Sequence, residues 1–226
     1  MALTEAQPDS KTPRLRSVDE TLVAGILDLY RQGWFPMADP DRGVVEWVQP
    51  EVRGTISLSP GGLVVARSLK QRCRKARFVI RSDTAFELVI RACAEARPGR
   101  DSTWINEEIV RAYMVLHRAG RAHSVEAWLE RDGESHLVGG LYGVHVGAAF
   151  FGESMFSRPE LGGTDASKVC LVRLWQHLRA RGFVLLDTQM WNPHLATLGC
   201  TEVPQAEFLK QLEHAVSREV AWEWSR

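Results

Sequence analysis

The sequence lacks several features on which metal, redox and membrane proteins depend. Its four cysteines, at positions 73, 93, 170 and 200, form no CxxC pair and no Cys/His ligand spacing, and no apolar run is long enough to span a bilayer or act as a signal segment. We therefore expect no metal site, no disulfide framework and no association with membranes. Free thiols fit a reducing compartment, which predicts a cytoplasmic protein.

Common catalytic motifs are also missing. The seven histidines show no HxxxH or HExxH arrangement, and no GxSxG segment is present, which argues against zinc-peptidase and serine-hydrolase sites of those types. The loop Q/R-x-x-G-x-G/A, with which acetyl-CoA-dependent enzymes cradle a pyrophosphate, is absent as well. We expect no bound cofactor.

Net charge gives no reason to bind nucleic acid, because 28 Lys and Arg balance 28 Asp and Glu. A basic surface must come from local clustering. Segment 66–81 supplies such a cluster, with seven cations and no acid: Arg67, Lys70, Arg72, Arg74, Lys75, Arg77 and Arg81. The ordinary explanation is a solvated helix face; the alternative is a surface that neutralises the phosphates of a nucleic acid.

The pattern of apolar residues and turn signals predicts an α/β (α+β) fold with a mixed sheet and helices on both sides. We expect a flexible tail at 1–16, a small N-terminal α/β domain at 17–61 and a larger domain at 62–226. The predicted helices are 18–32, 84–96, 106–118, 166–181 and 204–216. The predicted strands are 44–48, 54–58, 77–81, 122–130, 136–144, 147–152 and 183–189, with a loop at 97–106.

Three polar positions interrupt apolar segments and are candidates for chemistry. In FVLLDTQMW (183–191), the strand period of two puts Asp187 and Gln189 on one face, where a carboxylate and an amide could hold a substrate amine or simply cap a strand edge. In AAFFGESMFSR (148–158), Glu153 follows Gly152; a buried acid needs a partner, unless this is a strand end where Gly152 marks a bulge and the acid points to solvent.

The segment LGGTDASK (161–168) leads into a predicted helix, with Asp165 or Ser167 as its cap. A helix N-terminus can receive an anion or a developing oxyanion. Ser167 is therefore a candidate substrate contact.

A series of short blocks, in order from about residue 25 to about 210, resembles the bacterial leucyl/phenylalanyl-tRNA–protein transferases. The blocks are GWFP (33–36), EWVQP (46–50), ARSLK (66–70), TWI (103–105), AHSVEAW (122–128), LVGGLYGV (137–144), FFGESMFS (150–157), ASK (166–168), LLDTQ (185–189) and HLATLG (194–199). Agreement of so many blocks in register is far more specific than any one of them.

The resemblance implies an enzyme that takes Leu, Phe or sometimes Met from aminoacyl-tRNA and joins it to the N-terminus of a protein beginning with Arg or Lys. The added residue then marks that protein for degradation. The larger domain of the family looks like the acetyltransferase (GNAT) fold but uses the charged tRNA end in place of acetyl-CoA. The implied partners are aminoacyl-tRNA and an acceptor polypeptide, and we expect a monomer.

The resemblance also implies roles for individual residues. Asp187 would hold the incoming N-terminus, Gln189 would relay hydrogen bonding toward the ester carbon, and Glu153 would contact a polar group of the substrates. The amino-acid pocket would include Leu141, Phe150, Met155 and Leu174, Trp47 and Trp104 would hold the terminal adenosine, and the acceptor stem would contact Arg67, Lys70, Arg74 and Lys75.

The chain departs from the family pattern in three places. Trp47-Val48 stands where two adjacent tryptophans are usual, the N-terminal G-G-D-L stretch is absent, and PELGGTD (159–165) lengthens the loop before Ala166. These departures affect substrate specificity more than the class of reaction. Two other functions stay open at this point: a CoA-dependent N-acyltransferase of the same fold class, and a non-catalytic protein that binds tRNA ends.

Overall fold

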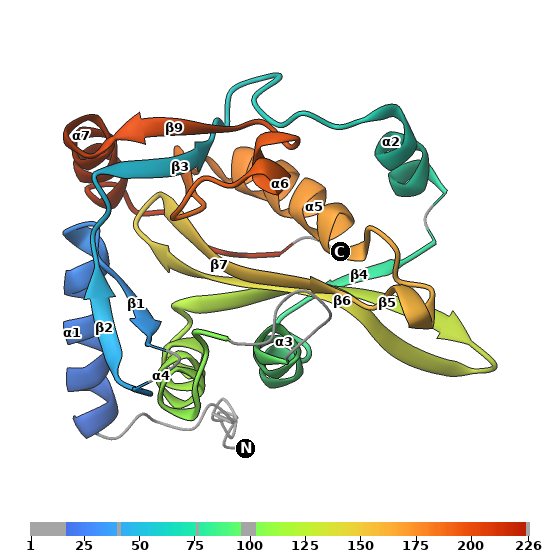
Figure 1. Cartoon of the computed structure of the whole chain (residues 1–226), viewed down its shortest axis with the longest axis horizontal. Coiled ribbons are helices and arrows are strands. Elements are labelled where there is room, and N and C mark those ends of the chain that lie inside the picture. The colour runs from blue at the N-terminus through green and yellow to red at the C-terminus, as the bar shows by residue number, and fades with distance from the viewer. Residues whose placement is uncertain (1–16, 40–41, 76, 96–102, 225–226) are drawn as a thin grey trace, which may run out of the picture.

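The computed structural model describes residues 17–39, 42–75, 77–95 and 103–224. The strands in these residues are β1 (Phe35–Ala38), β2 (Val45–Val48), β3 (Val52–Ile56), β4 (Val79–Ser82), β5 (Ala122–Arg131), β6 (Glu134–Val146), β7 (Ala149–Ser157), β8 (Leu185–Asp187) and β9 (Cys200–Pro204). One sheet has the order β4-β5-β6-β7-β8-β3-β9, and β1 pairs with β2 in a separate sheet (Figure 1). In the large sheet only the pairing of β7 with β8 is parallel, so the mixed sheet expected from the sequence is confirmed.

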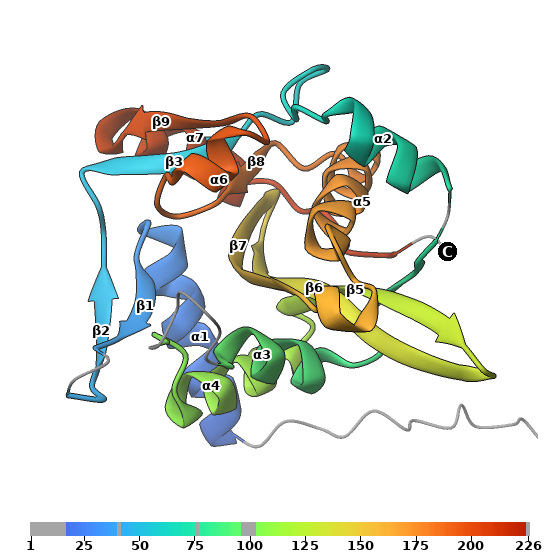
Figure 2. The same ribbon diagram turned by 45° about the vertical axis from the view of Figure 1, so that its right-hand side comes forward.

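Helices cover both faces of the large sheet. They are α1 (Ser17–Arg31), α2 (Arg67–Arg74), α3 (Phe86–Ala94), α4 (Glu107–Arg118), α5 (Ala166–Arg181), α6 (Pro193–Ala196) and α7 (Gln205–Val216), with a 3₁₀ turn at Pro159–Leu161. α3 and α4 lie on one face, and α5 and α2 lie on the other (Figure 2). α1 packs on α4 and α7.

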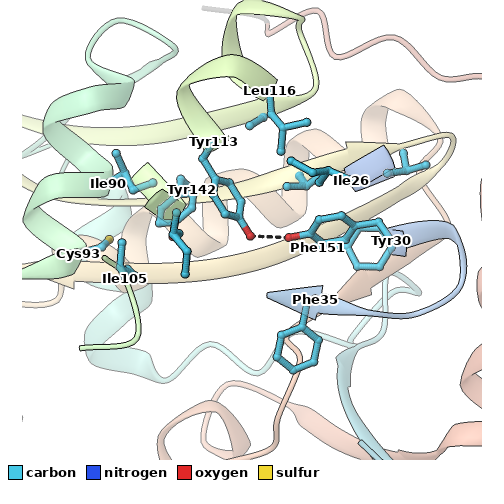
Figure 3. Packing of buried hydrophobic residues seen from close by; sticks show 14 of the residues in the cluster. Ile26, Tyr30, Phe35, Ile90, Cys93, Ile105, Tyr113, Leu116, Tyr142 and Phe151 are labelled. Atoms are coloured by element: carbon cyan, nitrogen blue, oxygen red, sulfur yellow. Dashed lines mark hydrogen bonds between the residues drawn. The ribbon is translucent and has the colours of Figure 1, made fainter. Parts of the chain in front are cut away.

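Each face of the sheet has its own hydrophobic core. Successive side chains of a strand point to opposite faces, so on β6 Tyr142 joins the first core, beneath α3 and α4, and Leu141 joins the second, beneath α5. In the first core, Tyr30 of α1 and Phe151 of β7 pack together, with the Tyr30 hydroxyl pointing at that of Tyr113 (Figure 3). Neighbouring residues of one strand therefore contribute to both cores.

Two strands escaped the sequence-based prediction. β1 contains Pro36, which normally argues against a strand, but β1 pairs only with β2 and tolerates the missing N–H. β9 is an edge strand beside β3, and most of its residues are exposed, so it carries no apolar pattern. The predicted strand 183–189 is too long, because β8 ends at Asp187.

Elements of the predicted N-terminal domain, 17–61, belong to the large sheet and to the first core, together with residues from the rest of the chain. Its strand β3 pairs with β8 and β9 in the large sheet, and residues of α1 and β1 belong to the first core. The division into 17–61 and 62–226, and the likeness of the second part to the GNAT fold, stay predictions. The tail at 1–16 lies outside the described residues.

Candidate active site

A cavity opens where β7 and β8 separate. The two strands pair in parallel at three positions, the last being Phe151 with Asp187. Beyond that pair a cavity of about 270 Å³ lies between residues 152–155 of β7 and the segment that follows β8. Side chains of β6 and α5 form its apolar wall, among them Leu141, Leu171 and Leu174. Ligands of open α/β sheets bind in this kind of crevice, at the carboxyl ends of diverging parallel strands.

A β-bulge places Glu153 at this cavity. Tyr142 of β6 lies opposite Ser154 and Gly143 opposite Gly152, so Glu153 has no partner across the ladder. A bulge re-aims the side chain that it carries. Glu153 is only 8% exposed, so the alternative in which it points to solvent is wrong, although the bulge itself is present.

Hydrogen bonds hold both oxygens of the Glu153 carboxylate. The Tyr30 hydroxyl donates to Oε1 at 2.7 Å, and the side-chain amide of Gln189 donates to Oε2 at 2.6 Å. The Tyr113 hydroxyl lies 2.5 Å from that of Tyr30 (Figure 3). Burial raises the pKa of Glu153 to about 7, although hydrogen bonds from both tyrosines and Gln189 lower it, and the charge of Asp187 adds to the rise.

Gln189 reaches Glu153 because its backbone turns sharply. Its φ of 65° lies in the left-handed region, which a non-glycine residue adopts only when the surroundings hold it there. Its N–H donates to Oδ1 of Asp187 at 2.9 Å, and its carbonyl accepts from the N–H of Gly54 at 2.8 Å. The acid and amide predicted to act together are thus joined through the backbone of the turn.

Asp187 does not line the cavity. Its side chain is fully buried and its two oxygens accept hydrogen bonds from Arg53. Sequence reasoning missed Arg53, because the predicted strand began at residue 54.

The absence of a side chain at Gly54 lets the turn approach β3. A Cβ there would lie 2.9 Å from both the Thr188 Oγ1 and the backbone N of Trp191. We expect Gly54→Ala to lower the free energy of unfolding by about 1–3 kcal/mol through overpacking, as measured by urea denaturation. Gly25→Ala in α1 is the control: its Cβ would meet nothing within 4 Å, so it should stabilise by about 0.5–1 kcal/mol. Equal effects of the two changes would contradict the close approach.

The predicted pocket residues divide into two groups. Leu141, Met155 and Leu174 line the cavity together with Glu153 and Gln189. Phe150 and Ser167 are buried but do not line it. The Phe150 ring stacks on Trp222, with centroids 5.3 Å apart, and the Ser167 hydroxyl accepts a 2.9 Å hydrogen bond from that of Ser157.

The two tryptophans expected at the terminal adenosine lie near β1. Trp47 is on β2, edge-on to the Tyr30 ring at 6.3 Å. The carbonyl of Trp104 accepts from the N–H of Ala38 at 3.1 Å. Both side chains pack against the first core and neither lines the cavity.

The four cations expected at the acceptor stem lie on or beside α2. Arg67, Lys70 and Arg74 are spaced to share one helix face; these three and Lys75 are exposed, while Leu69 faces the second core. Among the described residues none of the four forms an ion pair. Arg72 differs, because its Nε lies 2.9 Å from the carboxylate of Asp165.

The described ranges contain neither a cluster of metal ligands nor a membrane-spanning helix. No three His, Cys, Asp or Glu residues there gather as ligands for a metal ion. Within the same ranges, no helix is both long and apolar enough to cross a membrane.

The fold is thus a mixed α/β sheet with a cavity whose wall is apolar and whose polar end holds a buried carboxylate and amide. Residues 57–213 match the family model described as leucyl/phenylalanyl-tRNA protein transferase, and residues 22–51 match the model of that family's N-terminal domain.

Relatives agree with this match. The leucyl/phenylalanyl-tRNA–protein transferase of Rubrobacter xylanophilus is 51% identical over 191 residues, covering 84% of this chain and 93% of its own length. The proteins of the same name from Chlorobaculum parvum and Paramagnetospirillum magneticum are 48% and 50% identical over 198 residues each, covering 88% and 87% of this chain and 97% and 90% of their own lengths. The chain belongs to the leucyl/phenylalanyl-tRNA–protein transferase family, which confirms the resemblance found in the sequence.

Proposed function

We propose that the protein transfers leucine, phenylalanine and, less readily, methionine from aminoacyl-tRNA to the N-terminus of proteins that begin with Arg or Lys, and so marks them for degradation. The observation that carries the proposal is the apolar cavity that ends at Glu153 and Gln189, in a chain of this family. A cytoplasmic location and a monomeric state stay predictions from the sequence.

The apolar part of the cavity receives the side chain of the donor amino acid. Leu141, Met155 and Leu174 offer only carbon and sulfur atoms to it. Burying a Leu or Phe side chain there contributes about 1.5–3 kcal/mol. Because such a wall recognises bulk and not a specific polar group, it supports a choice among several apolar donors.

The polar end of the cavity brings the two reacting groups together. An ester becomes an amide, and an α-amino group, which titrates near 8, is already partly neutral at pH 7, so most of the acceleration comes from positioning and from handling one proton. Glu153, with its pKa of about 7, accepts that proton as the amine attacks, and returns it to the ribose oxygen of the tRNA as the ester C–O bond breaks. Gln189 holds the carboxylate in place, and Asp187 acts through the turn at Gln189.

Exposed cations and aromatic rings hold the RNA. Arg67, Lys70, Arg74 and Lys75 contact phosphates of the acceptor stem; such contacts carry no sequence information, which suits an enzyme that accepts several tRNAs. Trp104 stacks on the terminal adenosine, a contact worth about 1–3 kcal/mol per base, and Trp47 supports it as the remaining member of the usual pair.

A panel of donors and acceptors tests the proposal. The protein is incubated with tRNAs charged with Leu, Phe, Met, Ala or Lys and with peptides that differ only at their first residue, and the products are weighed by mass spectrometry. We expect gain of Leu, Phe or Met on peptides that begin with Arg or Lys. RNA binding without transfer, or acylation with acetyl-CoA as donor, would overturn the proposal in favour of a binding protein or a CoA-dependent enzyme.

The apolar wall makes a prediction about donor choice. Leu141→Trp fills space at the wall, so we expect kcat/KM to fall at least about tenfold more for Phe-tRNA than for Leu-tRNA. Leu178→Trp is the matched control, since Leu178 is buried on α5 but does not line the cavity. If kcat/KM falls by the same factor for Phe-tRNA and Leu-tRNA in Leu178→Trp, that fall reflects lost stability and not donor choice. If Leu141→Trp leaves the ratio of kcat/KM for Phe-tRNA to that for Leu-tRNA unchanged, this wall does not contact the donor side chain.

A further inference from the structure

Arg53 is a buried cation that joins β3 to three other parts of the structure. Its side chain is 1% exposed, and its Nε and Nη2 donate to Oδ1 and Oδ2 of Asp187 at 2.9 and 2.8 Å. Its Nη1 donates to the carbonyl of Gly33 at 2.7 Å, between α1 and β1. The guanidinium lies between the rings of Phe35 and Phe208, 4.5 and 4.6 Å from their centroids.

Stability alone does not explain this arrangement. Replacing a buried ion pair by apolar residues of similar volume often costs nothing. Here the carboxylate that Arg53 holds has a second partner, because Asp187 Oδ1 also accepts the N–H of Gln189. The side chain of Gln189 in turn holds Glu153. Arg53 is therefore two contacts away from the polar end of the cavity.

Asp187 and Glu153 are two acids in one buried region. The charge of Asp187 favours the protonated form of Glu153. Arg53 bonds both oxygens of Asp187 and so opposes this effect of its charge.

We propose that Arg53 is a positioning residue for transfer, which neutralises Asp187 so that Glu153 can ionise and which fixes the turn that aims Gln189 at Glu153. The proposal rests on the proposed role of Glu153 for its kinetic part only. Its structural part concerns the ionisation of Glu153 and can be measured without any transfer.

The other titratable groups around Glu153 do not replace Arg53. They come from several elements: Tyr30 of α1, Tyr113 of α4, Tyr142 of β6, Asp187 of β8 and His194 of α6. Burial and the nearby Glu153 raise the pKa of Tyr30 and of Tyr113 well above the usual value, which keeps both neutral near pH 7. Burial lowers the pKa of His194, so at pH 7 it carries little positive charge.

Three variants separate charge from geometry. Arg53→Met removes both the charge and the hydrogen bonds. The double variant Arg53→Met/Asp187→Asn removes both charges and keeps an oxygen that can accept from the Gln189 N–H. Arg53→Lys keeps a charge but loses the planar fork that bonds two carboxylate oxygens and the Gly33 carbonyl together. Arg181→Met, which loses a surface ion pair with Glu223 and a hydrogen bond to the Ala221 carbonyl, is the control.

The first measurement is the pH dependence of kcat for transfer. In Arg53→Met we expect the acidic limb of the kcat profile to move to higher pH by at least about one unit. At a pH below the acidic limbs of both proteins, this shift makes kcat about tenfold lower than in the parent protein. The effect on KM should be smaller. The double variant should return the limb to its original pH and recover part of kcat. Arg53→Lys should keep the limb but lower kcat. Unchanged limbs in all variants, or a double variant no better than Arg53→Met, would overturn the proposal.

The second measurement needs no activity. The free energy of unfolding is followed from pH 4 to 9 in each background, with and without Glu153→Gln, and the difference reports the ionisation of Glu153. In the parent protein this difference changes up to about pH 7; in Arg53→Met it should keep changing to higher pH, and in the double variant it should not. Identical pH ranges would show that Arg53 only supports the fold. The parent protein could fail to transfer any amino acid while the unfolding measurements give the expected pH ranges. That result would overturn the proposed function but not the effect of Arg53 on the ionisation of Glu153.

Discussion

Glu153→Gln is expected to lower the rate of transfer by about 10²–10⁴-fold, the usual contribution of a positioned acid or base. The amide has nearly the shape of the carboxylate that Tyr30 and Gln189 hold, but it cannot accept a proton from the attacking amine. Single-turnover transfer from Phe-tRNA to a peptide that begins with Arg measures the change. Binding of a non-hydrolysable aminoacyl-tRNA analogue should be unchanged.

The stability of the same variant provides the control. The pKa of Glu153 is raised by burial from 4.5 to about 7, so between these values the unfolded chain loses the proton while the folded chain keeps it. The contribution of Glu153 to the stability of the parent protein therefore falls as the pH rises from 4.5 to 7, and Glu153→Gln lacks this fall. The variant should be more stable than the parent above pH 7, by at most about 3 kcal/mol. A stable variant with parental kcat would rule out proton transfer to Glu153.

Reversing the charged face of α2 is expected to have the second large effect. With Arg67, Lys70 and Arg74 all changed to Glu, the slope of log K against log salt for tRNA binding should become shallower by about 3, near 0.9 for each lost phosphate contact. Affinity at low salt should fall most. Filter binding over a series of salt concentrations measures both quantities.

Two controls make this result specific to RNA phosphates. Lys210→Glu reverses an exposed cation on α7, away from α2 (Figure 1), and should leave the slope unchanged. Transfer from a short aminoacyl-adenosine donor, which has no acceptor stem, should survive the triple reversal. If the slope of the triple variant equals that of the parent protein, α2 does not contact the RNA.

Local patterns in the sequence predicted most of the long elements. α4, α5, α7, β5 and β6 all lie close to their expected bounds. The short elements β1 and β9 could not be found this way: β1 contains Pro36, and β9 is mostly exposed and pairs with β3, which is distant in sequence. Strand identity at four or five residues depends on tertiary contacts more than on propensity.

The sequence predicted which polar residues matter better than how they are arranged. It singled out Asp187, Gln189 and Glu153, and the structure joins all three. Strand alternation suggested that Asp187 and Gln189 face the same way, but the left-handed turn at Gln189 sends one into the protein and the other to the cavity. Tyr30 lies within the predicted helix 18–32, and its contact with Glu153 spans 123 positions of sequence, so no local pattern predicts it.

β3 has a consequence for dissecting the protein into pieces. The match to the N-terminal domain ends at residue 51, and the match to the main family model begins at residue 57. A cut between the two matches therefore falls within or next to β3. A fragment starting at residue 57 would leave β8 and β9 without the strand that lies between them and would lose the only cation bound to Asp187 among the described residues. We therefore expect neither half to be active alone, because the large sheet and the ion pair at Asp187 need residues from both matches and from the strand between them.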